Sequence, residues 1–99
     1  MLQITVDDLA ILASPTVIDV REPDEYVAGH VPGATNIPLS QLSARLGDIS
    51  TAGPAYIICQ SGGRSARATQ ALADASINAV DIAGGTSAWQ AAGHPVDAA

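Results

Sequence analysis

Short apolar runs alternate along the chain with segments in which apolar residues recur at helical spacing. Runs of this length that are rich in β-branched residues are typical of strands buried in a sheet. The predicted strands are residues 3–6, 16–20, 35–38, 55–59 and 79–83. Because strands alternate with helical segments, the pattern indicates an α/β fold with a largely parallel sheet.

The helical segments carry signals of where helices begin and end. Asp7 is the predicted N-cap of the first helix, and Thr86 or Ser87 is the predicted N-cap of the last, which contains Trp89. Gly93 stands where a C-terminal capping glycine belongs. The predicted helices are residues 8–13, 23–28, 40–46, 65–75 and a final segment that ends before residue 93.

Composition and charge narrow the possible functions. The 99 residues, of which 47% are hydrophobic and 14% charged, predict a single globular domain over residues 1–99. The net charge is −6 and all four basic residues are arginine, so the chain has no basic patch for nucleic acid and no basic amphipathic helix for a membrane. An anionic substrate would therefore have to be bound by a local positive pocket.

The single cysteine excludes an internal disulfide, a Cys-x-x-Cys redox pair and a cysteine-based zinc site. The two histidines lack ligand spacing, so we predict no metal and no cofactor. No apolar run approaches the length of a membrane span, and no secretory signal is visible at the N-terminus. These features predict a cytoplasmic protein.

The candidate chemistry lies where the most apolar strand ends at Cys59, just before a predicted helix. Ligands bind at the carboxyl ends of strands in open α/β sheets. The N–H groups of residues 60–65 can form an anion-binding nest that favours a thiolate, helped by the positive end of the helix. Gly62 and Gly63 allow the positive φ values that such a nest needs. Arg64 offers a planar set of donors for an oxyanion.

An ordinary structural role for the cysteine is the alternative, since a buried cysteine often behaves as a small apolar residue. Glycines are poor at a junction of strand and helix unless the backbone path requires them. The Gly-Gly-Arg-Ser sequence at residues 62–65 therefore favours a nucleophilic Cys59 over simple packing.

The loop Cys59-Gln60-Ser61-Gly62-Gly63-Arg64-Ser65 resembles the active-site loop of the rhodanese-domain sulfurtransferases, Cys-x-x-Gly-x-Arg. Residues 17–22, 25–26, 29–34 and 36–38 resemble the family's N-terminal signature. Residues 83–89, with the Gly93-x-Pro95 ending, resemble its C-terminal signature. The resemblance spans residues 4–96. Ser76 departs from it, because the family usually has glycine there.

The resemblance implies a three-layer α/β/α fold with a five-stranded parallel sheet in the order 3-2-4-5-1. It also implies that Cys59 is a catalytic nucleophile that takes sulfane sulfur from a small anionic donor such as thiosulfate. The loop from Gln60 to Ser65 would hold the persulfide, with Arg64 contacting the donor. The acceptor would be cyanide or a thiol, which a protein could carry.

Several polar residues outside this loop have a simpler structural interpretation. Asp19 and Arg21 end a strand expected beside that of Cys59, which leaves open that they face the site. We predict instead that they, together with Glu22, brace the loops through buried charge-assisted bonds. His30 is expected to be hydrogen-bonded scaffolding, and His94 to be exposed. The acids at 22, 24 and 25 are expected to form a solvated helix start, and Trp89 to be a core residue.

Three other functions compete with thiosulfate sulfurtransferase activity. Phosphatases of related fold hold phosphate in a longer Cys-x5-Arg loop, whereas Cys59 and Arg64 are separated by four residues. Noncatalytic binding modules of the family typically lack the cysteine. A persulfide carrier that delivers sulfur to a specific protein partner fits the sequence equally well, because no motif encodes the acceptor surface.

Overall fold

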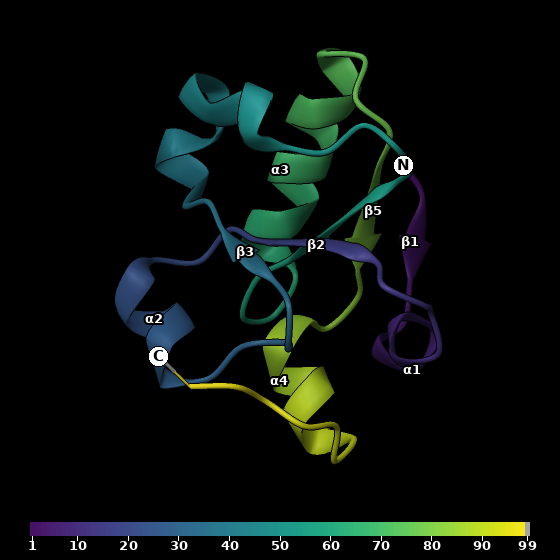
Figure 1. Ribbon diagram of the computed structural model, residues 1–99, viewed down its shortest axis with the longest axis vertical. Helices are drawn as coiled ribbons and strands as arrows, with labels where there is room; N and C mark the ends of the chain where they lie inside the picture. The colour runs from purple at the N-terminus through teal and green to yellow at the C-terminus, as the bar shows by residue number, and fades with distance from the viewer. Residues whose placement is uncertain (99) are drawn as a thin grey trace.

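The computed structural model of the protein describes residues 1–98 and contains one sheet with helices on both faces (Figure 1). The strands are β1 (Gln3–Ile4), β2 (Thr16–Asp19), β3 (Thr35–Asn36), β4 (Ala55–Ile58) and β5 (Ala79–Ile82). Neighbouring strands all pair in parallel, in the order β1-β5-β4-β2-β3. Read from the other edge, this is the predicted order, so the predicted fold class is confirmed.

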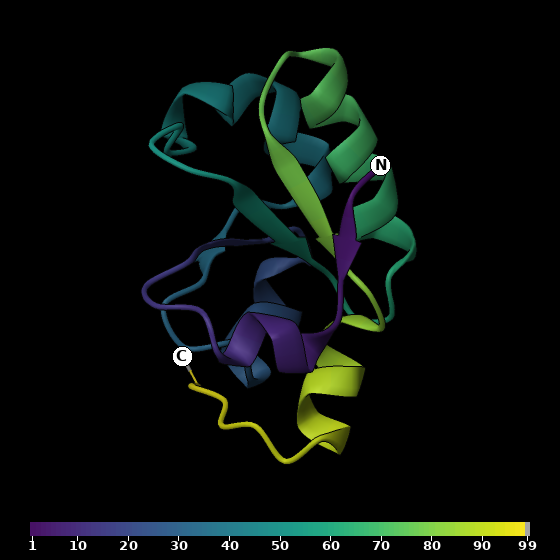
Figure 2. The ribbon, with the colours of Figure 1, turned by 90° about the vertical axis from the view of Figure 1, so that its right-hand side faces the viewer.

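The helices form two layers around the sheet. They are α1 (Val6–Ala10), α2 (Pro23–Ala28), the 3-10 helix η1 (Leu39–Asp48), α3 (Gly63–Asp74) and α4 (Gly85–Ala91). Figure 2 shows α3 and η1 on one side of the sheet, with α1 and α4 on the other. No helix formed by residues 1–98 is long and apolar enough to cross a membrane.

The central strand β4 is covered by helices on both faces, and its successive side chains point to opposite faces. Ile57 packs in the cluster that contains Leu72 of α3, whereas Ile58 packs in the cluster that contains Trp89 of α4. Cys59 continues this alternation and joins the cluster on the α3 side. The strand period therefore directs the thiol toward the start of α3.

The structure corrects the predicted ends of the first and last helices. The N-cap of α1 is Thr5, not Asp7: its hydroxyl accepts from the N–H of Asp8 at 3.1 Å, and the Asp8 carboxylate accepts from the N–H of Thr5 at 3.1 Å. This capping box satisfies two backbone donors at once, which a single aspartate cap does not. The N-cap of α4 is Gly84 in the left-handed region, so Thr86 and Ser87 lie inside the helix.

Other boundaries differ for reasons of backbone geometry. The segment predicted as an α-helix over residues 40–46 is a longer 3-10 helix with a kink at Arg45. Helix α3 begins at Gly63, two residues earlier than predicted, because Gly62 takes a φ of 118° and turns the chain directly into the helix. Strands β1 and β3 are each two residues long, shorter than predicted.

Ser76 follows α3 with a φ of 63°, in the left-handed region that favours glycine. We expect Ser76→Gly to raise the free energy of unfolding by about 1 kcal/mol, because the side chain no longer strains the backbone. Urea unfolding measures the change. Ser43→Gly, inside η1 where φ is not positive, is the control and is expected to lower stability by about 0.5–1 kcal/mol. A loss of stability in both variants would contradict the prediction.

Candidate active site

The carboxyl ends of three neighbouring strands meet at one edge of the sheet. Strand β2 leads to Arg21, β4 leads to Cys59, and β5 leads to the glycine pair before α4. Cys59 is 1% exposed and begins the loop that connects β4 to α3. The parallel topology therefore brings the loop predicted from the sequence next to residues from two distant segments.

Hydrogen-bonding groups of the loop surround the sulfur of Cys59. The N–H of Gly62 donates to Sγ at 3.1 Å, and the hydroxyl of Ser65 lies 3.4 Å from Sγ. In the thiol form Sγ donates to the Ser65 oxygen, whose own proton goes to the Gly62 carbonyl at 3.1 Å. This bond holds the hydroxyl beside the sulfur, where it can turn its proton to a thiolate. This arrangement suits a thiolate, because each hydrogen-bond donor that faces an anionic sulfur stabilises its charge.

The pKa of the Cys59 thiol reflects two opposing effects. Burial raises it, whereas the Ser65 hydroxyl and the N–H groups of Ser65, Gly62 and Ser61 lower it. The hydrogen bonds outweigh burial, so the pKa lies below the ordinary value of a cysteine thiol. The thiolate is the nucleophilic form, and the loop increases its share at neutral pH.

Alkylation of Cys59 by iodoacetamide should follow a pH profile with its midpoint below the value of about 8.5 for a free cysteine. The rate should rise with pH through that midpoint because deprotonation creates the nucleophile. We expect Ser65→Ala to move the midpoint upward by removing one donor. Stopped alkylation followed by mass spectrometry measures both profiles. Coincident profiles for the two proteins would show that Ser65 does not stabilise the thiolate.

The start of α4 orients the peptide groups of the loop. The carbonyl of Cys59 accepts from the N–H of Thr86 at 2.8 Å and from its hydroxyl at 3.0 Å, and the carbonyl of Gln60 accepts from the N–H of Ser87 at 3.0 Å. Because the Gln60 carbonyl is turned toward α4, the N–H of Ser61 in the same peptide turns toward the sulfur. The sequence did not reveal this role, since hydroxyl residues after two glycines are also typical of caps.

Glycines have unequal roles around the loop. A Cβ at Gly85, whose φ is 60°, would lie 2.5 Å from the Cys59 carbonyl oxygen. Gly62 has a φ of 118°, as the nest requires. Gly63 has no positive φ, and a Cβ there would meet nothing within 4 Å. The prediction of a positive φ is therefore wrong for Gly63, because the chain is already helical at that residue.

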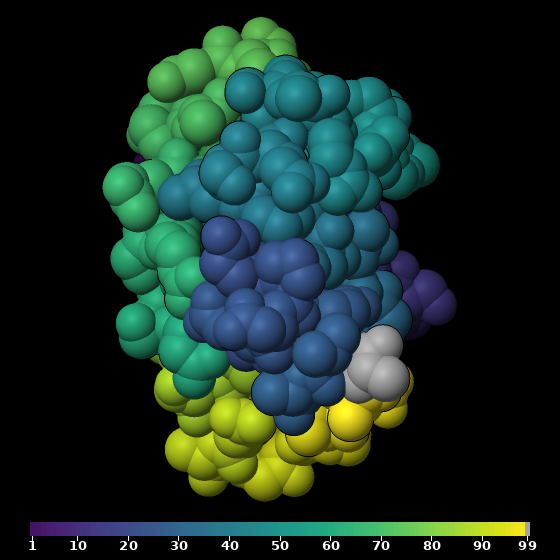
Figure 3. Space-filling model, turned by 90° about the vertical axis from the view of Figure 1, so that its left-hand side faces the viewer, coloured from purple at the N-terminus to yellow at the C-terminus, as the bar shows by residue number. Residues whose placement is uncertain are grey.

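Arg64 does not point freely into the loop but pairs with Glu25 of α2. Its Nη1 and Nη2 atoms lie 2.7 and 2.8 Å from the two carboxylate oxygens. Figure 3 shows α2 at the surface beside the start of α3. The ion pair joins these two helices. The prediction of a wholly solvated acidic helix start is therefore wrong for Glu25, which is about 30% exposed.

Hydrogen bonding to Arg64 holds the pKa of Glu25 at about 2, well below its ordinary value of 4.5, although burial opposes the shift. The carboxylate is consequently ionised at physiological pH. The ion pair stabilises the folded state fully at pH values above 4.5, the ordinary pKa of glutamate. This stabilisation is lost as the pH falls through the folded-state pKa of about 2.

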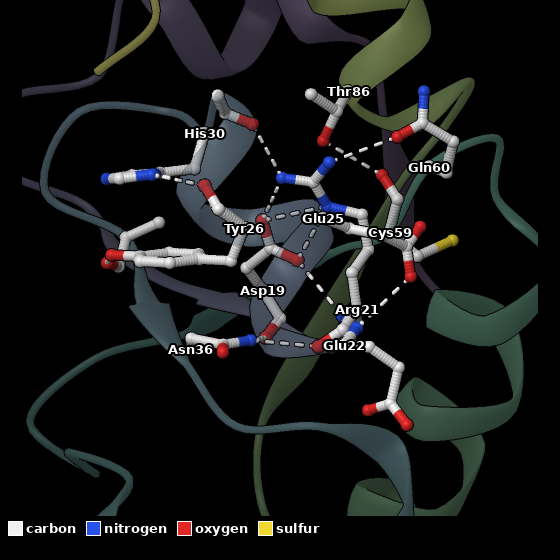
Figure 4. A network of polar contacts seen from close by, with 12 residues as sticks. Asp19, Arg21, Glu22, Glu25, Tyr26, His30, Asn36, Cys59, Gln60 and Thr86 are labelled. Carbon is white, nitrogen blue, oxygen red and sulfur yellow. Dashed lines mark hydrogen bonds and ion pairs between the residues drawn. The ribbon is translucent and has the colours of Figure 1, made fainter. Parts of the chain in front are cut away.

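Asp19 and Arg21 form a buried ion pair beneath the loop, in which Nη2 of Arg21 lies 2.8 Å from Oδ2 of Asp19. The side chains are 0% and 3% exposed. Arg21 also donates to the Gly29 carbonyl at 2.8 Å and to Oε1 of Gln60 at 3.0 Å. Figure 4 shows its guanidinium between Asp19 and Gln60, with the Cys59 sulfur directed away from it. The pair therefore contacts the loop through the Gln60 side chain and not through the Cys59 sulfur.

The Gln60 side chain is turned away from the sulfur. Its Nε2 donates to the Ser87 hydroxyl at 2.7 Å while its Oε1 accepts from Arg21. Gln60 thus connects the loop to α4 and to the end of β2. Any contact of Gln60 with a substrate held at Cys59 would come from its backbone N–H.

The histidines and the tryptophan lie outside the thiol site. His30 is buried, stacks on Tyr26 and places Nδ1 2.8 Å from the Tyr26 carbonyl, as scaffolding would. His94 is not fully exposed as predicted: Nε2 lies 2.7 Å from Oδ1 of Asp7, and its ring packs against Trp89. Trp89 is 5% exposed, which confirms its place in the core.

Comparison with known proteins agrees with the geometry. The sequence matches the rhodanese-like domain family over residues 5–92. It is 46% identical over 74 residues to the uncharacterized protein YqhL of Bacillus subtilis, covering 74% of this chain and 59% of that protein. It is 37% identical over 111 aligned positions to thiosulfate sulfurtransferase 16, chloroplastic, of Arabidopsis thaliana, covering 96% of this chain and 90% of the relative.

A solved structure gives the same result for the fold. The crystal structure of a rhodanese-related protein from Thermoplasma volcanium matches with a TM-score of 0.91 at 35% identity, covering 97% of each chain. The fold and the site agree with this match: the sheet is parallel, and the loop between its central strand β4 and helix α3 begins with Cys59. The chain belongs to the rhodanese-like domain family. This membership, together with the sulfurtransferase relative, supports a role in sulfur transfer.

Proposed function

We propose that the protein is a sulfurtransferase that moves sulfane sulfur from thiosulfate or a similar donor to cyanide or a thiol through a persulfide on Cys59. The observation that carries the proposal is the placement of Sγ among the donors of a tight loop, with the Gly62 N–H at 3.1 Å and the Ser65 hydroxyl at 3.4 Å. Such a loop stabilises both a thiolate and the terminal sulfur anion of a persulfide.

The reaction proceeds in two displacements. The Cys59 thiolate attacks the outer sulfur of thiosulfate, the S–S bond breaks, and sulfite leaves with the bonding electron pair. The acceptor then attacks the terminal sulfur of the persulfide and the Cys59 thiolate leaves. With cyanide the product is thiocyanate, and with a thiolate it is a new persulfide. No external oxidant or reductant is needed, and no metal or cofactor takes part.

The identity of the acceptor separates this proposal from the carrier alternative, in which a protein thiol receives the sulfur. Both functions use the same persulfide, so the shared first step is the one to test. A phosphatase function is disfavoured by the spacing of Cys59 and Arg64, which makes a smaller loop than Cys-x5-Arg. Disulfide reduction is also disfavoured, because the chain has one cysteine and none to resolve the persulfide. A reducing cytoplasm would suit the free thiol.

Intact mass spectrometry after incubation with thiosulfate tests the proposal. We expect wild-type protein to gain one sulfur atom and to lose it when cyanide is added. Cys59→Ser is the matched control and should gain nothing. Failure of the wild-type protein to gain sulfur from thiosulfate and from an organic persulfide would overturn the proposed function. Hydrolysis of an aryl phosphate that disappears in Cys59→Ser would favour the phosphatase alternative.

A further inference from the structure

Arg64, the arginine of the thiol loop, already donates one N–H from each terminal nitrogen to a carboxylate. Arg64 gives Nη1 and Nη2 to the two oxygens of Glu25, at 2.7 and 2.8 Å. This two-point geometry is the one that an arginine uses to bind an oxyanion such as a sulfonate. Glu25 therefore holds the same donors that a sulfonate-bearing substrate would require.

The carboxylate is held in place by its own helix. The N–H of Glu22 donates to Oε1 of Glu25 at 3.2 Å across the first turn of α2. Glu25 and Arg64 are each about 30% exposed, so the pair stands at the surface where solvent and solutes reach it. An anion that uses the same two-point geometry on Arg64 must therefore displace the carboxylate. An anion at the remaining N–H groups meets a guanidinium whose charge Glu25 already balances.

The other arginine next to the loop offers no substitute. Nε and Nη2 of Arg21 donate to Asp19, and its remaining bonds go to the Gly29 carbonyl and the Gln60 side chain. Its positive charge is therefore balanced beneath the loop by a carboxylate that is 0% exposed. A dianion such as thiosulfate gains little attraction from Arg21, and Glu25 repels it.

Persulfides without an oxyanion are affected differently. Their charge lies on the reacting sulfur atoms, which the loop N–H groups and Ser65 receive at Cys59. They need nothing from Arg64. We infer that Glu25 is a specificity residue that competes with sulfonate-bearing donors for Arg64, so that the site favours organic persulfides over thiosulfate. This inference rests on the proposed function and names its class of donor.

Steady-state kinetics with two donors tests the inference, using thiosulfate and the persulfide of 2-mercaptoethanol with cyanide as acceptor. We expect Glu25→Gln to raise kcat/KM for thiosulfate about fivefold, mainly through KM, as expected for the release of a partly exposed ion pair. The value for the organic persulfide should change by less than about twofold. Circular dichroism checks that the variant is folded.

Two controls separate competition from a general effect of charge. Asp24→Asn removes one exposed charge from the same helix turn without touching Arg64, and should leave both donors unchanged. In an Arg64→Ala background, Glu25→Gln should lose most of its effect on thiosulfate, because only the direct repulsion by the Glu25 charge is then removed. Equal gains for both donors, equal gains in Asp24→Asn, or slower thiosulfate turnover in Glu25→Gln would each overturn the inference. The proposed function fails separately, if wild-type protein accepts sulfur from neither donor.

Discussion

Gly85→Ala is expected to lower the free energy of unfolding by about 3 kcal/mol and to reduce sulfur transfer to Cys59 to background. The new Cβ would lie 2.5 Å from the Cys59 carbonyl oxygen and 2.7 Å from the carbonyl carbon of Gln60. These are backbone atoms that cannot move without tilting the loop. Overpacking of this kind costs about 1–3 kcal/mol, and a φ of 60° adds about 1–2 kcal/mol for any residue with a Cβ.

Gly93→Ala is the matched control, because it introduces the strain of a positive φ without any close contact. Gly93 has a φ of 80°, and a Cβ there would meet nothing within 4 Å. It should lose only about 1 kcal/mol and keep full transfer activity. Urea unfolding and the mass assay with thiosulfate measure both variants. Similar losses in the two proteins would mean that close packing of α4 against the loop does not position Cys59.

Asp19→Ala is expected to lower the free energy of unfolding by about 3–5 kcal/mol, because it leaves the buried charge of Arg21 without its partner. Three bonds from the guanidinium to the carboxylate disappear, at 3.0, 3.1 and 2.8 Å. Arg21 also holds Oε1 of Gln60, so we expect slower sulfur transfer in whatever fraction stays folded. Chemical denaturation measures the stability loss.

Two further variants define the origin of that loss. Asp48→Ala breaks the Arg45 pair, whose members are 35% and 56% exposed, and should cost less than about 1 kcal/mol. Asp19→Ala combined with Arg21→Met removes both charges and should recover part of the stability lost in Asp19→Ala. If Asp19→Ala costs no more than Asp48→Ala, burial of the pair does not determine its contribution.

Local patterns predicted the elements of this fold well, but not their ends. The run at β4 is apolar on both faces, so its central position follows directly from the sequence. The cap of α1 is different, because Thr5 and Asp7 are both good capping residues and the choice depends on which one faces Asp8. The resemblance to a known family supplied the order of the strands, which hydrophobic spacing alone does not contain.

The sequence by itself identified Cys59, its glycine turn and Arg64 as one candidate site, because these residues are neighbours along the chain and their backbone chemistry is local. Only the tertiary structure decided what each of them contacts. Arg64 meets Glu25 from 39 residues away, and the Cys59 carbonyl meets Thr86 across 27 residues. Such pairings depend on which helix covers which strand end, and the linear pattern treats every acid in a helix turn alike. The sheet topology makes that choice, because parallel strands bring distant loops to one edge.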